Sequence, residues 1–144
     1  MSMFIFKTEP SDYAYADLVR DGRTPWDGIT NPGALKHLRS ARPGDLAFIY
    51  HTATQRAIVG LGRILTEPYP DPNRPELTKA GQIKYPLVDI EPVAQAPRPV
   101  TLAQIKQDPR FEGFTLIREA RLSVVPVPAA LGKILRSLAG FTGR

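Results

Sequence analysis

The stretch LAFIYHTATQRAIVGLGRIL, residues 46–65, decides the class of fold. Two apolar runs, Leu46 to His51 and Ala57 to Leu65, flank a polar segment, which is the pattern of a β-hairpin. Gly60 and Gly62 alternate within the second run. Glycines inside a strand often mark a bend, or a place where a ligand or another segment of backbone comes close. We therefore predict a central hairpin in a sheet that curls toward a barrel.

Upstream of this hairpin, the sequence predicts one strand and two helices. Met3 to Lys7 has the alternation of a strand. Ser11 can cap a helix that runs to about Asp21 and stops at Gly22. Asn31-Pro32 begins the second helix, because Asn caps well and Pro suits the first helical position. The residues expected to face inward are Tyr15, Leu18, Val19, Ala34, Leu35 and Leu38.

Downstream of the hairpin, prolines and helix caps divide the chain. Glu67 to Gln82 holds four prolines and is expected to be a long extended loop. The elements expected after it are a strand from Ile83 to Val93, a short helix between the capping box Thr101-Leu102-Ala103-Gln104 and Asp108-Pro109, a strand from Leu122 to Val127, and a helix from Pro128 to Gly140. Strands clustered in the middle with short connections predict a mixed α/β fold, whose antiparallel or mixed sheet is flanked by helices.

The bulk composition fits a single domain over residues 1–144. Its 42% hydrophobic and 23% charged residues are ordinary for a globular domain. No apolar run approaches membrane-spanning length, and Met1 to Lys7 lacks the features of a secretory signal. The chain has no cysteine, which excludes disulfides and thiolate chemistry. We expect a soluble, cytoplasmic protein with no membrane contact and no obligate protein partner.

Charge and motif content favour binding over catalysis. The net charge of +5 and the pI of about 9.7 suggest a polyanionic partner such as nucleic acid. The sequence lacks a Gly-x-Ser-x-Gly elbow, a phosphate-binding loop and a Gly-x-Gly-x-x-Gly fingerprint. Its two histidines, His37 and His51, lie fourteen residues apart, too far for a two-histidine metal motif within one helical turn. We predict no catalytic set, no metal and no cofactor.

Five short stretches carry a more specific signal. They are Lys7-Thr8-Glu9-Pro10, Trp26-Asp27-Gly28-Ile29-Thr30-Asn31, Phe48-Ile49-Tyr50-His51-Thr52, Ile58-Val59-Gly60-Leu61-Gly62 and Arg121-Leu122-Ser123-Val124-Val125-Pro126-Val127. In this order and at domain length, the five stretches resemble the EVE domain family. The resemblance extends from Met3 to about Gly140.

The resemblance implies both a fold and a function. The fold is PUA-like, a curved β-barrel flanked by helices, and it is akin to that of YTH domains, which read methylated adenine in RNA. Members of the family are understood to bind nucleic acid that carries modified bases, with modified cytosine in DNA prominent among the proposed ligands. In such folds the pocket is surrounded by positions that correspond here to Lys7, Thr8, Trp26, Tyr50 and His51.

One segment departs from the family pattern. Family members usually continue after Trp-Asp-Gly with Arg-Asn-Tyr and then Gln-Ala-Arg, whereas this chain has Thr30-Asn31-Pro32-Gly33-Ala34-Leu35. The loop thereby loses two cations and an aromatic side chain beside the expected pocket. This loss bears on ligand choice and on contacts with phosphate.

The chemistry of a nucleobase assigns roles to these residues. Trp26 and then Tyr50 are the candidates to stack on its flat face, which is worth about 1–3 kcal/mol per base. Short side chains that can donate and accept hydrogen bonds suit its polar edge. The predicted base pocket consists of Lys7, Thr8, Trp26, Asn31, Tyr50, His51 and Ser123, and the predicted phosphate contacts are Lys7, Arg118 and Arg121.

These assignments have structural alternatives, and the function has competing hypotheses. A lone tryptophan often anchors a core, His51 can bond to backbone, and Asn31 can act only as a helix cap. The leading hypothesis is a non-enzymatic reader of a modified base. The second is an enzyme acting on a nucleoside, nucleotide or RNA, with Lys7, Glu9 and His51 as acid–base groups. The third is a small-molecule- or protein-binding module on the same fold.

Overall fold

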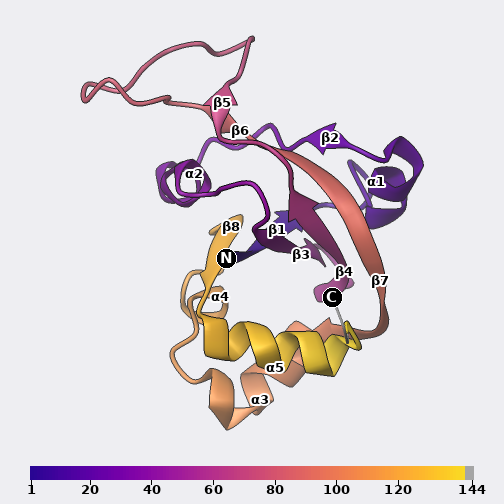
Figure 1. Cartoon of the computed structure of the whole chain (residues 1–144). Coiled ribbons are helices and arrows are strands. Elements are labelled where there is room, and N and C mark those ends of the chain that lie inside the picture. The colour runs from indigo at the N-terminus through magenta and orange to yellow at the C-terminus, as the bar shows by residue number, and fades with distance from the viewer. Residues whose placement is uncertain (142–144) are drawn as a thin grey trace.

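A six-stranded mixed sheet forms the centre of the computed structural model, which describes residues 1–141 (Figure 1). The order across the sheet is β2-β7-β4-β3-β1-β8, so the curled sheet forms a half-barrel with β2 and β8 at its edges. The strands are β1 (Met3–Thr8), β2 (Thr24–Pro25), β3 (Leu46–His51), β4 (Ala57–Ile64), β7 (Asp89–Thr101) and β8 (Val124–Val127). A separate ribbon, β5 (Tyr69–Pro70) and β6 (Pro86–Leu87), carries the long loop at the top of Figure 1.

Strand direction places two strand ends side by side. Strands β1 and β3 pair in parallel, whereas β1–β8, β3–β4, β4–β7 and β2–β7 pair antiparallel. The parallel register sets Lys7 beside Tyr50 and Thr8 beside His51. Parallel neighbours end at the same edge of a sheet, so the residues that close β1 and β3 emerge together.

The sheet bends at the glycine-containing strand β4, as the sequence predicts. The register shifts between Ile49 and Tyr50 on β3, and between Ile58 and Gly60 on β4 where it pairs with β7. Such irregularities bend a strand and increase its twist. A Cβ atom on Gly60 would lie 2.3 Å from Cε1 of Tyr15, so a residue without a side chain is needed for this ring to pack. The close approach at Gly60 is made by an aromatic ring of the same chain.

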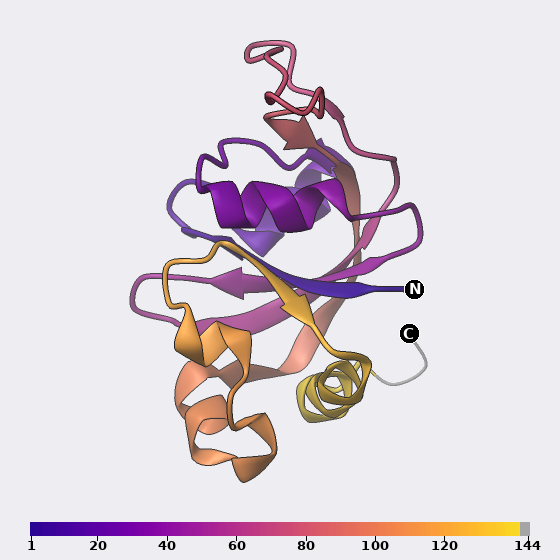
Figure 2. The ribbon, with the colours of Figure 1, turned by 90° about the vertical axis from the view of Figure 1, so that its left-hand side faces the viewer.

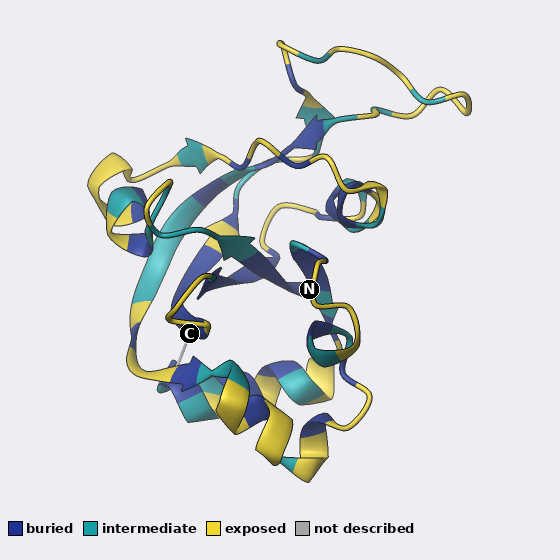
Figure 3. Ribbon diagram, turned by 180° about the vertical axis from the view of Figure 1, so that it is seen from behind, coloured by how far each residue is buried: buried dark blue, intermediate teal, exposed yellow. Residues whose placement is uncertain are grey.

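Helices cover the two ends of the half-barrel. They are α1 (Tyr15–Asp21), α2 (Pro32–Arg39), α3 (Leu102–Gln107), α4 (Thr115–Arg118) and α5 (Ala129–Ala139), with a 3-10 turn, η1 (Pro109–Phe111). Helix α2 lies on one side of β1 and β8, and α4 and α5 lie on the other (Figure 2). Buried residues follow the strands and the inner helix faces, while the β5–β6 loop is largely exposed (Figure 3). Within residues 1–141, no helix has the length and apolar character needed to cross a membrane.

Several predicted helix boundaries are confirmed. The side-chain oxygen of Asn31 accepts a hydrogen bond from the Ala34 N–H at 3.1 Å and caps α2. Thr101 and Gln104 form the predicted capping box at the start of α3. The last helix, α5, ends as predicted at Gly140, whose φ of +86° suits glycine.

The first helix begins later than the sequence predicts, at Tyr15. The Ser11 N–H donates to the Glu9 carboxylate at 2.8 Å, and this bond holds Ser11 in a turn rather than at a helix cap. Ala14 instead takes the N-cap position without a side-chain cap, and its N–H donates to the carboxylate of Asp17 at 2.8 Å. A local turn therefore competes successfully with the expected first helical turn.

Three other expectations are wrong. Val19 is 55% exposed, because α1 buries a narrower face than its apolar pattern suggests. The segment 83–93 is not one strand, since its middle forms β6 and β7 runs on from Asp89 to Thr101. The prolines in β7 lie where its register against β4 is irregular, a place where a sheet tolerates proline. Strand β8 begins at Val124 rather than Leu122.

Candidate functional site

A cleft of about 740 Å³ opens at the edge of the sheet where β1 ends. It is lined by the end of β1 and the turn after it, by β2 and the loop leading to α2, and by the loop before β8. Backbone hydrogen bonds hold these segments in place: the Lys7 N–H donates to the Ser123 carbonyl at 2.9 Å, and the Trp26 N–H donates to the Val88 carbonyl at 2.8 Å. The walls of the cleft are therefore fixed to the central sheet.

Trp26 and Tyr13 form an aromatic corner in this cleft. The indole of Trp26 stacks on Phe6 with ring centroids 5.4 Å apart, and Tyr13 meets it edge-on at 6.3 Å. Trp26 is only 7% exposed, so the structural alternative for this residue, a core anchor, is confirmed. It also lines the cleft with the surface that remains. Tyr13 is absent from the predicted site, although an aromatic residue so soon after a strand-end motif could have suggested it.

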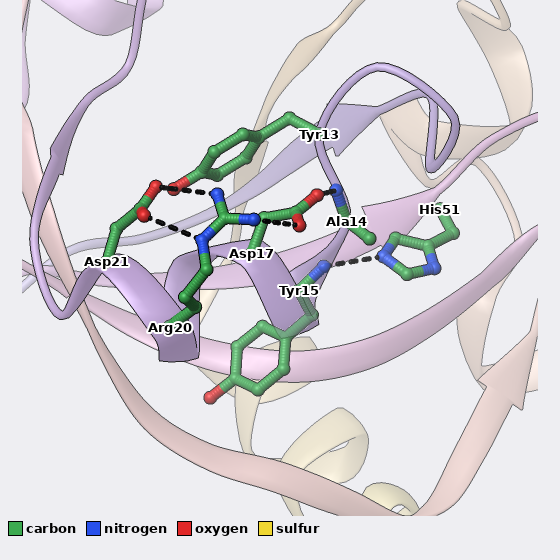
Figure 4. Close-up of polar contacts among 7 residues, drawn as sticks. All are labelled: Tyr13, Ala14, Tyr15, Asp17, Arg20, Asp21 and His51. Carbon is green, nitrogen blue, oxygen red and sulfur yellow. Dashed lines mark hydrogen bonds and ion pairs between the residues drawn. The ribbon is translucent and has the colours of Figure 1, made fainter.

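A hydrogen-bonded network holds Tyr13 at the rim (Figure 4). Its hydroxyl donates to the Asp21 carboxylate at 2.8 Å. Arg20 in turn pairs with Asp21 at 2.9 Å and with Asp17 at 3.0 Å. Burial, and then the bond to Asp21, raise the pKa of the Tyr13 phenol. The aromatic corner is thus held in place by polar contacts outside the cleft.

Carboxylates outnumber cations around the cleft. Glu9, Asp12 and Asp27 line it, against the two cations Lys7 and Arg121. These acids form no metal site, since no group of three metal-ligating side chains is positioned to hold an ion within residues 1–141. Such a lining favours a ligand that presents hydrogen-bond donors, rather than one that presents only negative charge.

Lys7 lies where the cleft meets a smaller hollow, and it lines both. Its Nζ donates to the Ala120 carbonyl at 2.9 Å and lies 5.7 Å from the centre of the Tyr50 ring. Partial burial removes water from the ammonium group and so lowers the pKa of Lys7. An ammonium group has three donors, so bonds beyond the one to Ala120 are open to it.

Three short polar side chains of the predicted site line the cleft: Thr8, Asn31 and Ser123. The Thr8 hydroxyl donates to the Tyr13 carbonyl at 2.7 Å and can still accept. The oxygen of Asn31 is engaged in capping α2, which leaves its amide N–H groups for a ligand. The segment that departs from the family pattern therefore still contributes to the wall.

The structure does not bring Tyr50 and His51 into this cleft. His51 is 8% exposed, and its Nε2 accepts from the Tyr15 N–H at 3.0 Å (Figure 4). Its Nδ1 lies 2.8 Å from the side-chain oxygen of Gln55. The ring turns toward α1 because the first N–H groups of a helix need acceptors. Tyr50 lies under Lys7 and lines the smaller hollow. Neither residue therefore lines this cleft, and a contact of either one with a base stays a prediction.

Arg118 and Arg121, both predicted to contact phosphate, differ in position. Arg121 lines the cleft, whereas Arg118 is exposed at the end of α4 and does not line it. Arg118 is the last residue of α4, whereas Arg121 lies in the loop that leads to β8. A phosphate contact of either residue stays a prediction.

Comparison with known proteins identifies the family. The model of the EVE domain matches residues 2–138. The chain belongs to the EVE domain family. Rat thymocyte nuclear protein 1 is 32% identical over 121 residues, which are 72% of this chain and 54% of the rat protein. The chain thus spans about half the length of the curated relatives that it matches.

Solved structures confirm the fold. A protein of Rhodopseudomonas palustris determined by NMR is 34% identical, with a TM-score of 0.87 over 100% of this chain and 97% of that one. The human THYN1 protein, crystallised with DNA containing 5-methylcytosine, is 26% identical with a TM-score of 0.84 over 96% and 98%. A YTH domain of Zygosaccharomyces rouxii, at 15% identity and a TM-score of 0.58 over 95% and 85%, shares the fold. The expected EVE and YTH-like architecture is therefore present.

Proposed function

We propose that this EVE domain binds nucleic acid and holds one modified base in the cleft. The observation that carries the proposal is the aromatic corner of Trp26 and Tyr13 inside a cleft that is also lined by carboxylates and short polar side chains. An aromatic wall suits the flat face of a base, and the polar groups suit its edge. One cleft thus offers the two kinds of contact that a nucleobase requires.

The carboxylates favour particular bases. Glu9 and Asp27 line the cleft and can accept hydrogen bonds from an exocyclic amino group, which cytosine and adenine both carry. The Thr8 hydroxyl and the Asn31 amide can complete the edge. A methyl group on the base adds apolar surface, and a matching wall favours it by about 1–3 kcal/mol. Modified cytosine or modified adenine is accordingly the ligand class that we propose.

The relative with known ligand supports cytosine first. The human THYN1 protein was crystallised with DNA that contains 5-methylcytosine. This chain spans only about half of the curated thymocyte nuclear proteins, so we carry over the base-binding role of the domain and nothing of the remainder. We also propose that the polymer is DNA, that the domain needs no obligate protein partner and that the protein is cytoplasmic.

One of the three acid–base residues expected for an enzyme does not line the cleft. Lys7 and Glu9 both line the cleft, but His51 lies outside it with contacts on both ring nitrogens. A general base must reach the proton that it removes. The arrangement therefore favours a binding function over acid–base chemistry by this trio.

Titration of labelled oligonucleotides tests the proposal. Single- and double-stranded probes would carry 5-methylcytosine, cytosine, N6-methyladenine or adenine at one central position, and fluorescence anisotropy would give each Kd. We expect one methylated probe to bind about 10- to 200-fold more tightly than its unmodified partner. Asp27→Asn should weaken binding of methylated and unmodified probes alike, because both bases carry the exocyclic amino group, whereas Glu112→Gln, an exposed carboxylate outside the cleft, should change neither Kd.

Three outcomes would contradict the proposal. Equal, weak binding to every probe at low salt would exclude base recognition. Turnover of a nucleoside that Glu9→Gln abolishes would support the enzyme instead. If a ligand that is not nucleotide-like co-purifies with the protein and occupies the cleft, the small-molecule-binding alternative is favoured.

A further inference from the structure

A second hollow, of about 330 Å³, adjoins the cleft and has a different charge. The strand end at Lys7 and Tyr50, the turn between β3 and β4, and helices α3 and α4 surround it. Its lining contains three cations, Lys7, Arg56 and Lys106, and no carboxylate. Nothing in the sequence motifs pointed to Arg56 or Lys106.

The cleft and the hollow share a wall. Lys7 lines both, and the segment that follows α4 also serves both, with Ala120 in the hollow and Arg121 and Ser123 in the cleft. The Lys7 side chain is held on this boundary by its bond to the Ala120 carbonyl. A flexible polymer that enters one depression can therefore continue into the other.

The two depressions select opposite charges. Three carboxylates and two cations line the cleft, which disfavours phosphate there, while the hollow presents only cations. We infer that the hollow binds the phosphodiester backbone of the strand whose base enters the cleft, with Arg56 and Lys106 as phosphate contacts and Lys7 at the junction. This inference rests on the proposed function and specifies how the strand runs.

The backbone around Arg56 supports its position at the rim. Arg56 has a φ of +46° and Ala53 a φ of +63°, values that residues other than glycine rarely adopt. The Arg56 carbonyl accepts from the Leu102 N–H at 2.8 Å, which ties the turn to α3. The Nε of Arg56 donates to the Ala53 carbonyl at 3.2 Å, so the remaining guanidinium donors are open to phosphate. The turn is thus held in an uncommon conformation that presents a cation beside Lys106.

The apolar side chains in the lining of the hollow would strengthen these contacts. Leu102, Leu116 and Ile117 line it alongside the three cations and Tyr50. Charge-assisted hydrogen bonds gain strength where water is partly displaced. The hollow accordingly suits a phosphate that lies against the protein rather than a loosely attracted ion.

The test measures salt dependence in Arg56→Gln, Lys106→Gln and the double variant. Each lost phosphate contact should lower the slope of log K against log salt by about 0.7 for a single strand. Affinity should fall about three- to fivefold per substitution at physiological salt, equally for methylated and unmodified probes. Binding of the free methylated nucleoside should not change. Lys133→Gln, an exposed cation on α5 that lines neither depression, is the matched control.

The outcomes separate this inference from the proposed function. Both substituted side chains are exposed, and recovery of the slope by Arg56→Lys would exclude misfolding as the cause of a loss. If methylated probes are still preferred but the salt slope of the double variant equals that of Lys133→Gln, the hollow does not bind the strand. The same conclusion follows if inorganic phosphate occupies the hollow without competing with the oligonucleotide.

If the slope falls as expected while all probes bind alike, the backbone contact stands and base recognition fails. Absence of any oligonucleotide binding overturns both.

Discussion

Strands β1 and β3 are parallel neighbours that end at one edge of the sheet, yet their last residues have different fates. Lys7 and Thr8 close β1 and line the cleft, whereas Tyr50 and His51 close β3 and do not. His51 has partners for both ring nitrogens, from Tyr15 and Gln55. Lys7 and Thr8 each make one side-chain bond to backbone and keep further capacity. Adjacency and residue type do not make a binding site when the polar groups are already used inside the fold.

Replacement of Trp26 should have the largest effect on the β1 side. Trp26→Ala removes a ring that stacks on Phe6, and it should lower the free energy of unfolding by about 3–5 kcal/mol, as measured by denaturant titration. It should also remove oligonucleotide affinity where the variant stays folded. Tyr13→Leu is the companion variant, because Tyr13 lines the cleft but is only partly buried. Wild-type affinity in Tyr13→Leu would show that the aromatic corner serves the core alone.

A substitution at Gly60 should test how tightly the Tyr15 ring packs against β4, the strand next to β3. Gly60→Ala places a Cβ 2.3 Å from Tyr15 and should destabilise the fold by about 1–3 kcal/mol in denaturant titrations. Tyr15→Leu in the same chain should recover part of this loss, since the clash is with the ring. Additive losses in the double variant would place the strain elsewhere.

His51 should behave as a structural residue. His51→Ala leaves the buried Tyr15 N–H without its acceptor, which should cost about 1–3 kcal/mol of stability. Oligonucleotide affinity should stay at the wild-type value, because His51 lies outside the cleft. Ser123→Ala should give the opposite pattern, with stability retained and affinity reduced, and calorimetry with anisotropy measures both. An affinity loss in His51→Ala without a loss of stability would contradict the comparison.

The smallest effect should come from the pH dependence of Lys7. Partial burial lowers its pKa below the ordinary 10.5, so the ammonium loses its proton earlier on alkalinisation than an exposed lysine does. Oligonucleotide affinity should therefore begin to fall at a pH below 10.5, and Lys7→Arg should prevent that fall because arginine keeps its charge. For stability the sign is opposite: the cost of burying the charged form disappears as pH rises through the folded-state pKa toward 10.5. If the affinity of Lys7→Arg falls with rising pH as that of the wild type does, the Lys7 charge has no role in binding.

Much of the fold could be predicted from local sequence. The β3–β4 hairpin, the Asn31 cap, the Thr101–Gln104 capping box and the stop at Gly140 are all where the sequence indicates. Each depends on residues close together in the chain, so neighbouring side chains suffice to specify it. The late start of α1 at Tyr15 was missed, because a turn between Glu9 and Ser11 competes with the helix.

The candidate site was predictable only in part. The strand-end and loop motifs located Lys7, Thr8 and Trp26, and the stretch before β8 added residues distant in sequence. Sequence alone determined which chemical groups are available and that a curled sheet would carry them. Tertiary structure decided which of them face solvent: Tyr15 packs on Gly60 and bonds through its N–H to His51, which directs that ring away from the cleft. Burial and hydrogen bonding between distant segments set the direction of a side chain, and no local pattern encodes either.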